Sequence, residues 1–243
     1  PEDIGHERQY DVLSKLWVSK DSWNEPDESE DEIALEAPAI QAVEGQSLKP
    51  ITMNIRSPLK IGYTFFETPF LRPDDVARAN HYYDVVVGGS TWCRNVLDEN
   101  GVRNTETIIQ GIDTGVFHAG VGEKELFKDR FVVFSGGKFE LRKGQDLVIR
   151  AFRVLQDRHD DVLLVNCWYN PWHGSLATMA ASPYIGYENP NGDYFQSMNQ
   201  ILHRNGIKDE NVVTLPPTPQ AEMPHIFRNT DCGLFPNRCE GGT

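Results

Sequence analysis

The most informative part of the sequence is residues 131–152, FVVFSGGKFELRKGQDLVIRAF. Phe131–Ser135 is a short, mostly apolar run with the length of a buried strand. After a glycine-containing loop, apolar residues from Leu147 to Leu155 recur at helical spacing. The pattern predicts a strand, a loop and a helix, which together form one βα unit.

The same order of elements extends outward in both directions. Downstream we expect strands at Val162–Cys167, Val212–Leu215 and Cys232–Phe235, and helices near Tyr194–Leu202 and Gln220–Asn229. Upstream we expect strands at Ile51–Ile55, Ile61–Phe66, Val85–Val87 and Ile108-Ile109, and helices at Asp74–Asn80 and Ser90–Glu99. Before Pro50, Tyr10–Val18 could form a short element, and the following residues are expected to form a solvated loop or a disordered insertion. Strands that alternate with helices predict the α/β class, with parallel, doubly wound sheets.

The loop of the first βα unit has the composition of an anion site. Gly136 and Gly137 allow the backbone to approach a ligand, and Lys138, Arg142 and Lys143 place three cations within six residues. A diphosphate is bound by such cations together with free backbone N–H groups. The alternative is a tight turn whose basic residues are only solvated.

Composition excludes several classes of function. The net charge of −13 disfavours nucleic acid as a partner, and eight of the acids lie in 21–36, where no Lys or Arg occurs. No apolar run approaches the ~18 residues of a transmembrane helix. The sequence contains neither G-x-x-x-x-G-K-[ST] nor G-x-G-x-x-G after a strand, which disfavours P-loop enzymes and dinucleotide oxidoreductases. No Asp-x-Asp pair and no C-x-x-C spacing occur, so no metal site is expected.

Several segments, in order along the chain, resemble glycosyltransferase family 4, a group of retaining enzymes with the GT-B fold. That family's donor domain begins with a strand, Gly-Arg, four residues, Lys-Gly and a helix; here Lys138 and Lys143 occupy the two cationic positions. Lys in place of Arg keeps the charge but lacks the bidentate fork. The other similar segments are 84–93, 109–117, 221–231 and the closing Glu240-Gly241-Gly242-Thr243, which resembles the start of the family's paired-glutamate motif.

The resemblance implies two Rossmann-like doubly wound domains, both incomplete in this chain. Residues 1–118 would be the later part of an acceptor-side domain with an acidic insertion near 21–36, and residues 119–243 the first part of the donor domain. Gly136, Gly137, Lys138 and Lys143 would bind the donor diphosphate. Glu240, Gly241, Gly242 and Thr243 would bind the donor sugar.

The implied reaction moves a sugar from a nucleoside diphosphate sugar to an acceptor, with retention and without a metal ion. The nucleotide sugar is a substrate, and no cofactor is expected. The acceptor, whether glycan, lipid, protein or small molecule, and the catalytic base are unknown. The chain alone is expected to be inactive, because the second glutamate and the first acceptor strands are not among its residues. The few cysteines favour the cytoplasm, with peripheral membrane attachment left open.

Three alternatives stay open at this stage. Glu67, after an expected strand, could contact the acceptor or lie in a surface loop. Trp168–Trp172 stands where the family usually has a glycine-rich turn, and could line the donor cleft or belong to core and rim packing. The whole protein could be a phosphorylase or epimerase of the same fold, or a non-catalytic module that binds nucleotide sugars or carbohydrates.

Overall fold

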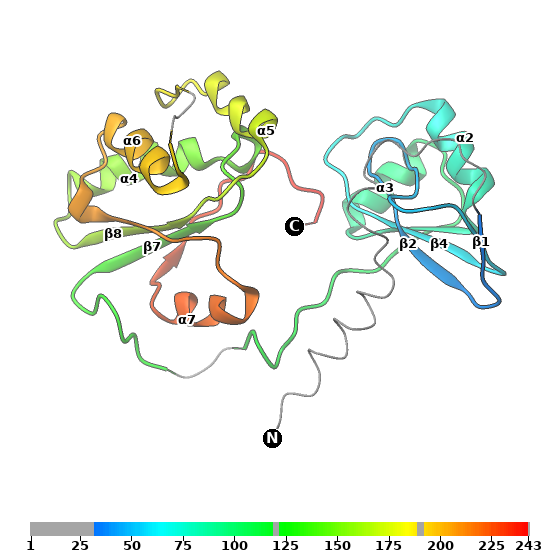
Figure 1. Ribbon diagram of the computed structural model, residues 1–243, viewed down its shortest axis with the longest axis horizontal. Coiled ribbons are helices and arrows are strands. Elements are labelled where there is room, and N and C mark those ends of the chain that lie inside the picture. The colour runs from blue at the N-terminus through cyan, green and yellow to red at the C-terminus, as the bar shows by residue number, and fades with distance from the viewer. Residues whose placement is uncertain (1–31, 119–121, 189–191, 243) are drawn as a thin grey trace. The chain divides into compact units, whose positions relative to one another are not determined.

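The computed structural model describes residues 32–118, 122–188 and 192–242. It divides into two compact units, one ending at Ile109 and the other comprising Gln110–Gly241. Each unit contains its own parallel sheet and its own apolar core (Figure 1). Most of the acidic stretch 21–36 lies outside the described residues.

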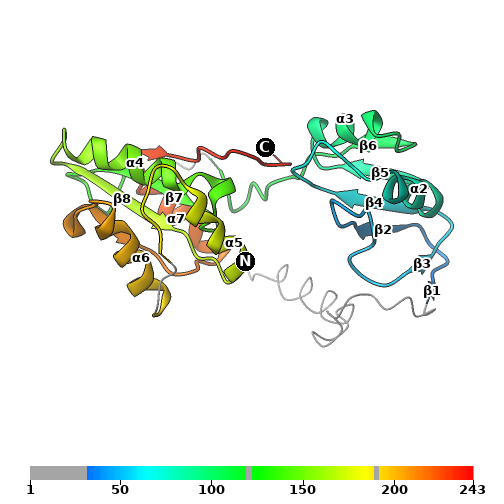
Figure 2. The same cartoon turned by 90° about the horizontal axis from the view of Figure 1, so that it is seen from above.

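The first unit is built on a four-stranded parallel sheet in the order β2-β4-β5-β6, visible from above in Figure 2. Its strands are β1 (Ile33–Ala34), β2 (Ala39–Ala42), β3 (Ile55–Arg56), β4 (Lys60–Thr64), β5 (Val85–Gly88) and β6 (Thr105–Thr107), and its helices are α2 (Pro73–Tyr82) and α3 (Thr91–Glu99). The short strands β1 and β3 pair separately from this sheet.

Both helices of the first unit contribute to one core. Ala79 of α2 and Leu97 of α3 are fully buried in the same cluster as Val86 of β5. The Ser90 hydroxyl caps α3 by accepting a hydrogen bond from the Cys93 N–H at 3.1 Å. Gly101, with φ of 87°, ends the helix. The sequence pattern predicted both helices, and the structure confirms them.

The second unit contains a four-stranded parallel sheet in the order β10-β7-β8-β9. Its strands are β7 (Phe131–Gly136), β8 (Val162–Cys167), β9 (Val212–Thr214) and β10 (Cys232–Gly233). Its helices are α4 (Gln145–Gln156), α5 (His173–Ala177), α6 (Tyr194–Arg204) and α7 (Met223–Arg228), with the 3-10 turns η2 (Leu141–Lys143), η3 (Thr178–Ala181), η4 (Asp209–Asn211) and η5 (Gln220–Glu222).

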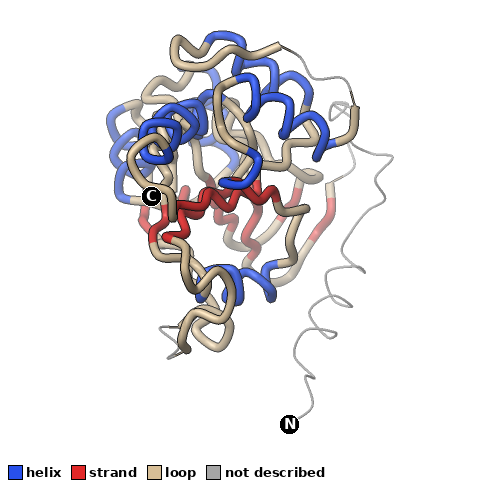
Figure 3. The backbone as a smooth tube through the Cα atoms, turned by 90° about the vertical axis from the view of Figure 1, so that its left-hand side faces the viewer, coloured by secondary structure: helices blue, strands red, loops and turns tan. Residues whose placement is uncertain are grey.

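Helices cover both faces of this sheet, with strands between helical layers in Figures 1 and 3. On one face, Phe152 of α4 and Leu202 of α6 pack against Leu164 of β8. On the opposite face, Ile226 of α7 packs against a smaller cluster that includes Phe134 of β7. The predicted α/β class with parallel, doubly wound sheets is therefore confirmed.

The structure corrects three expectations in the first unit. Residues 39–42, expected to form loop, are strand β2 and pair in parallel with β4. Of the expected strand Ile51–Ile55, only Ile55 is in a strand. The strand expected at Ile108-Ile109 lies earlier, as β6, and both isoleucines follow it as exposed residues. In the second and third cases apolar side chains indicated a strand where the backbone hydrogen bonds form elsewhere, whereas residues 39–42 carry too few strand-forming side chains to indicate one.

The division between the units also differs from the expected boundary at residue 118. The Ile108 N–H still bonds to the Gly88 carbonyl, and the Tyr63 hydroxyl donates to the Ile108 carbonyl at 2.9 Å. These bonds attach the chain to the first sheet as far as the residues just after β6. The acceptor and donor roles of the two units stay predictions.

Candidate functional site

The candidate site is the loop that joins β7 to α4 in the second unit. Parallel strands place their following loops at one edge of a sheet, and ligands of doubly wound folds bind at that edge. Gly137 has a φ of 104°, which disfavours any residue with a side chain, and its N–H bonds to the Cys167 carbonyl of β8 at 3.1 Å. The loop therefore begins with a turn that is fixed to the neighbouring strand.

A buried glutamine fixes the shape of the loop from inside. The Gln145 amide donates to the Lys138 carbonyl at 2.7 Å and accepts from the Glu140 N–H at 3.3 Å. Between these two residues, the fully buried Phe139 ring packs on Trp168 at 5.6 Å between ring centroids. The backbone of residues 138–140 is thus held at both ends, and the side chains of Lys138 and Glu140 extend from a fixed support.

The loop brings three cations and two carboxylates together. The Lys143 ammonium pairs with the Glu240 carboxylate. The Arg142 guanidinium bridges the two acids, at 3.1 Å from Glu240 and 2.9 Å from Glu140. The Lys138 ammonium lies 3.8 Å from Glu140. The predicted diphosphate residues Lys138 and Lys143 therefore share one network with the predicted sugar residue Glu240.

Arg142 was not among the predicted site residues, although it is central to this network. The available signal was the count of three cations within six residues. The family pattern assigns roles only to Lys138 and Lys143, so it does not identify Arg142 as a site residue.

The segment that carries Glu240 is fastened to the loop by a second ion pair, in which Asp146 is buried and the Arg238 side chain is 32% exposed. Arg238 donates to both oxygens of Asp146, at 2.8 and 2.7 Å, and to the Leu141 carbonyl at 2.6 Å. Asp146 is fully buried in the first turn of α4 and also accepts from the Ser182 hydroxyl at 2.6 Å. This pair sets the position from which Glu240 reaches the cations.

Ionisation of Asp146 is favoured by these partners. Burial alone raises the pKa of this carboxyl, but the hydrogen bonds from Arg238 and Ser182 outweigh burial and hold the pKa of Asp146 below its usual value. The same contact with Asp146 raises the pKa of the Arg238 guanidinium. Both groups are therefore charged at neutral pH, and the ion pair is intact.

Gly144 allows the two segments to approach each other. Its φ of 76° lies in the left-handed region, and a Cβ atom at this position would overlap the backbone carbonyl of Pro236. Neither Gly144 nor the Asp146–Arg238 pair was predicted as part of the site, because the residues they contact lie about 90 positions away in sequence.

The remaining predicted residues have different surroundings. Gly241 follows Glu240 in the same segment and is buried, Gly242 is exposed, and Thr243 lies outside the described residues. Glu67 is exposed in the loop between β4 and α2 of the first unit. The roles in sugar and acceptor binding stay predictions for all of them.

The two alternatives for the aromatic segment after β8, core packing and a place beside the site, apply to different residues of Trp168–Trp172. The Trp168 side chain is fully buried, and its indole N–H donates to the Ser135 hydroxyl at 3.1 Å, so this residue is core. The Trp172 side chain is 60% exposed, and the Lys138 ammonium lies 4.8 Å from its ring centroid. Trp172 therefore borders the candidate site.

Two negative findings apply to residues 32–118, 122–188 and 192–242, the part of the chain that the structure describes. Within these ranges, His, Cys, Asp and Glu side chains form no group of three or more that could hold a metal ion. The helices in these ranges also lack the length and apolar character needed to cross a membrane.

No protein-family model matches the chain, and a comparison with curated proteins finds no match. Solved structures do match in fold. Anabaena Alr3699/HepE in complex with UDP gives a TM-score of 0.51 at 14% identity, over 74% of this chain and 47% of that chain. A trehalose-6-phosphate synthase from Burkholderia multivorans gives 0.53 at 12% identity, over 76% and 47%.

A third match is a point mutant of S. aureus TarM, solved with fondaparinux, alpha-GlcNAc-glycerol and UDP. It gives a TM-score of 0.50 at 13% identity, over 77% of this chain and 33% of that chain. This chain thus spans about half the length of the first two matched proteins and a third of TarM. The predicted GT-B type of fold is confirmed by these similarities.

Replacing Gly144 tests whether its contact with Pro236 matters. Gly144→Ala should lower the free energy of unfolding by more than the ~1–2 kcal/mol of a left-handed residue, because the new methyl group also displaces the Pro236 carbonyl. Urea unfolding gives the measurement. Gly206→Ala is the control, since its φ of 81° is similar but its nearest neighbour is the flexible Arg153 side chain. Equal losses in the two variants would contradict the role of Pro236.

The Asp146–Arg238 pair predicts a pH-dependent loss of stability. Because the pKa of Asp146 is lower in the folded chain, the carboxylate stabilises the fold fully above its unfolded pKa of about 3.9, and this stabilisation is lost as the pH falls through the folded pKa. Asp146→Asn should cost about 1.5–3 kcal/mol at pH 7, the range for a lost charge-assisted hydrogen bond, since the partly exposed Arg238 can be solvated. The cost should shrink below pH ~4.

Urea unfolding of both proteins at several pH values measures this difference. The exposed Asp157→Asn, at the end of the same helix, is the control and should change stability by less than about 0.5 kcal/mol at every pH. A cost for Asp146→Asn that stays constant from neutral to acidic pH would show that the ion pair is not its source.

Proposed function

We propose that this protein is a glycosyltransferase that moves a sugar from a nucleoside diphosphate sugar to an acceptor. The observation that carries the proposal is the cluster of Lys138, Arg142 and Lys143 at the carboxyl end of β7, beside Glu240. A cationic loop at this edge of a doubly wound sheet suits a phosphorylated ligand. The matched Anabaena protein, solved with UDP and with UDP-glucose, gives independent support for this class of ligand.

The chemistry of the proposed reaction explains why cations gather here. Breaking the bond between sugar and diphosphate moves negative charge onto the departing diphosphate. Fixed cations stabilise that charge in the transition state more than in the ground state, which lowers the barrier. Helix α4 begins at Gln145, two residues after Lys143, and its N-terminal partial positive charge acts in the same direction. We infer that Lys138 and Lys143 bind the diphosphate and that Gly136 and Gly137 let it approach the backbone closely, although the Gly137 N–H itself is bonded to the Cys167 carbonyl.

The proposed role of Glu240 is recognition of the donor sugar. A carboxylate accepts several hydrogen bonds from hydroxyl groups, and Gly241 and Gly242, which follow Glu240, add no side chain beside it. In the structure this carboxylate pairs with Lys143 and Arg142. A diphosphate would therefore compete with Glu240 for the same cations, and binding of the donor would release the carboxylate for the sugar.

The finer parts of the proposal come from the resemblance to glycosyltransferase family 4. They are retention of configuration, independence of metal ions, donor binding by the second unit and acceptor binding by the first. The cytoplasm is the proposed location, because the sequence has only four cysteines and they show no C-x-x-C spacing.

Two variants test the division of roles. Lys143→Ala should weaken binding of a nucleoside diphosphate by roughly 10- to 100-fold, because it removes a charge-assisted contact worth about 1.5–3 kcal/mol. Glu240→Gln should leave this affinity unchanged or increase it, because the carboxylate that competes for Lys143 is neutralised. Isothermal titration calorimetry with UDP and with GDP gives both affinities. Equal weakening in the two variants would contradict the assignment.

The reaction itself is tested by binding and turnover together. We expect one of UDP-glucose, GDP-mannose or ADP-glucose to bind the chain. We also expect the native protein to release the corresponding nucleoside diphosphate when an acceptor is present. Coupled detection of the released diphosphate measures turnover. Suppose that the nucleotide sugar binds tightly but no nucleoside diphosphate is released with a glycan, a lipid, a protein or a small molecule as acceptor. That result would instead identify a non-catalytic binding module.

A further inference from the structure

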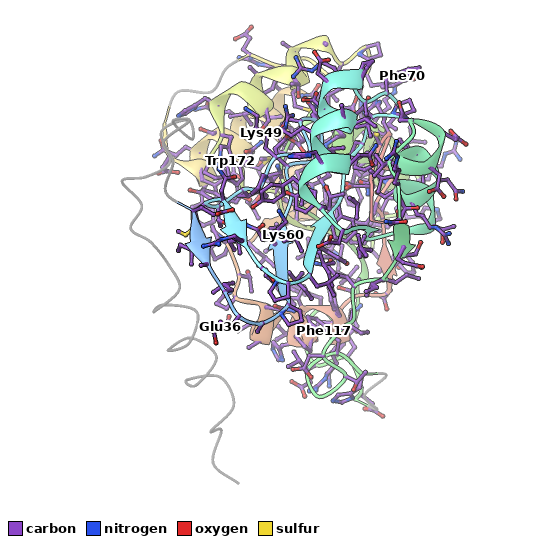
Figure 4. All side chains as sticks on the ribbon, turned by 90° about the vertical axis from the view of Figure 1, so that its right-hand side faces the viewer. Glu36, Lys49, Lys60, Phe70, Phe117 and Trp172 are labelled. Carbon is purple, nitrogen blue, oxygen red and sulfur yellow. The ribbon has the colours of Figure 1, made fainter. Side chains whose placement is uncertain are left out.

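We propose that Trp172 is a positioning residue for Lys138: its indole face directs the ammonium toward the diphosphate without neutralising the ammonium charge. This inference rests on the proposed function, since it adds a residue to the same anion site. The observation behind it is the position of the Lys138 ammonium, 4.8 Å from the centre of the Trp172 ring. Figure 4 shows Trp172 among the side chains of the chain.

The two residues stand on loops that are fixed to each other. The Asn170 amide donates to the Phe139 carbonyl at 3.0 Å and to the Ser175 hydroxyl at 3.0 Å. The same side chain accepts from the Trp172 N–H at 3.0 Å. Asn170 therefore ties the residue after Lys138 to the backbone of Trp172. The loop structure therefore holds the backbones of the two residues at a separation from which the ammonium group and the ring can meet.

A lysine at this position needs such an orienting group. Its charge lies at the end of a flexible four-carbon chain, and it lacks the planar fork by which an arginine fits a diphosphate. Lys138 is 38% exposed, so solvent alone would leave several rotamers accessible. Contact with a fixed ring removes some of that freedom before a ligand binds, which favours binding.

The ring is suited to this task because it attracts the cation without cancelling its charge. The quadrupole of an indole face attracts an ammonium group, but the ring carries no net charge. Glu140, the other neighbour of Lys138, lies closer to Arg142 than to Lys138, at 2.9 against 3.8 Å. Glu140 thus offsets mainly the charge of Arg142, and the positive charge of Lys138 remains largely available to attract an incoming anion.

Inorganic pyrophosphate is the probe that tests this inference, because it carries the diphosphate without base or sugar. Trp172→Ala should weaken pyrophosphate binding to the chain by about two- to fivefold, and Trp172→Phe should restore most of the affinity, because phenylalanine keeps an aromatic face. In a Lys138→Ala background, Trp172→Ala should have no further effect. Titration calorimetry gives all these affinities.

Tyr169→Ala is the matched control. Tyr169 is an exposed aromatic residue of the same loop, but its ring packs on Tyr194 instead of Lys138. We expect its affinity for pyrophosphate to equal that of the unchanged chain. A second measurement needs no ligand: NMR should show upfield ring-current shifts of the Lys138 side-chain protons, retained in Trp172→Phe and lost in Trp172→Ala.

The outcomes separate the inference from the proposed function. If the unchanged chain binds pyrophosphate and Lys138→Ala weakens that binding, but Trp172→Ala does not, the positioning role is wrong and the anion site stands. An equal loss from Trp172→Ala with and without Lys138 would also overturn it, since the tryptophan would then act independently of the lysine. No binding by the unchanged chain, or none lost in Lys138→Ala, would refute the anion site and the inference together.

Discussion

The candidate site depends on the ion pair between the buried Asp146 carboxylate and Arg238. Asp146 belongs to the first turn of α4 and holds Arg238 through two hydrogen bonds, and bonds from Arg238 to the Leu141 and Arg142 carbonyls attach the same segment to the loop. Glu240 follows Arg238 by two residues and reaches the cations of the loop only because that segment is fixed. The position of the acid that faces the cations is therefore decided by an ion pair that takes no direct part in binding.

The site thus contains a permanent ion pair and a set of replaceable ones. Asp146 is shielded from water, so its separation from Arg238 would leave a charge without compensation. Among the contacts of Lys138, Arg142 and Glu240, the Glu240 carboxylate is 13% exposed where Asp146 is fully buried, so an incoming anion can displace Glu240 at a lower cost than Asp146. A surface whose framework is rigid and whose charges can exchange partners is suited to hold an anion and then release it.

The sequence predicted the framework of this site better than its connections. The β7–loop–α4 unit was recognisable because its apolar run, glycines and helical period are local features. The grouping of Lys143 with Glu240 was predicted only through a family resemblance, and the Asp146–Arg238 pair was not predicted, because 92 residues separate two charges that have no local pattern. Strand β2 was missed because its alanines and Gln41 carry little strand signal, although Gln41 is buried and bonds to Met53 and Tyr82.

The glycine at position 144 has a consequence for how this protein can change over evolutionary time. Since the Pro236 carbonyl occupies the space of any side chain at that position, a single mutation there damages the loop before a compensating mutation can arise. The neighbouring cations meet no such barrier and can be exchanged one at a time. Proteins that descend from this sequence should therefore differ in the ligand that they select but keep the close approach between residue 144 and the Pro236 carbonyl.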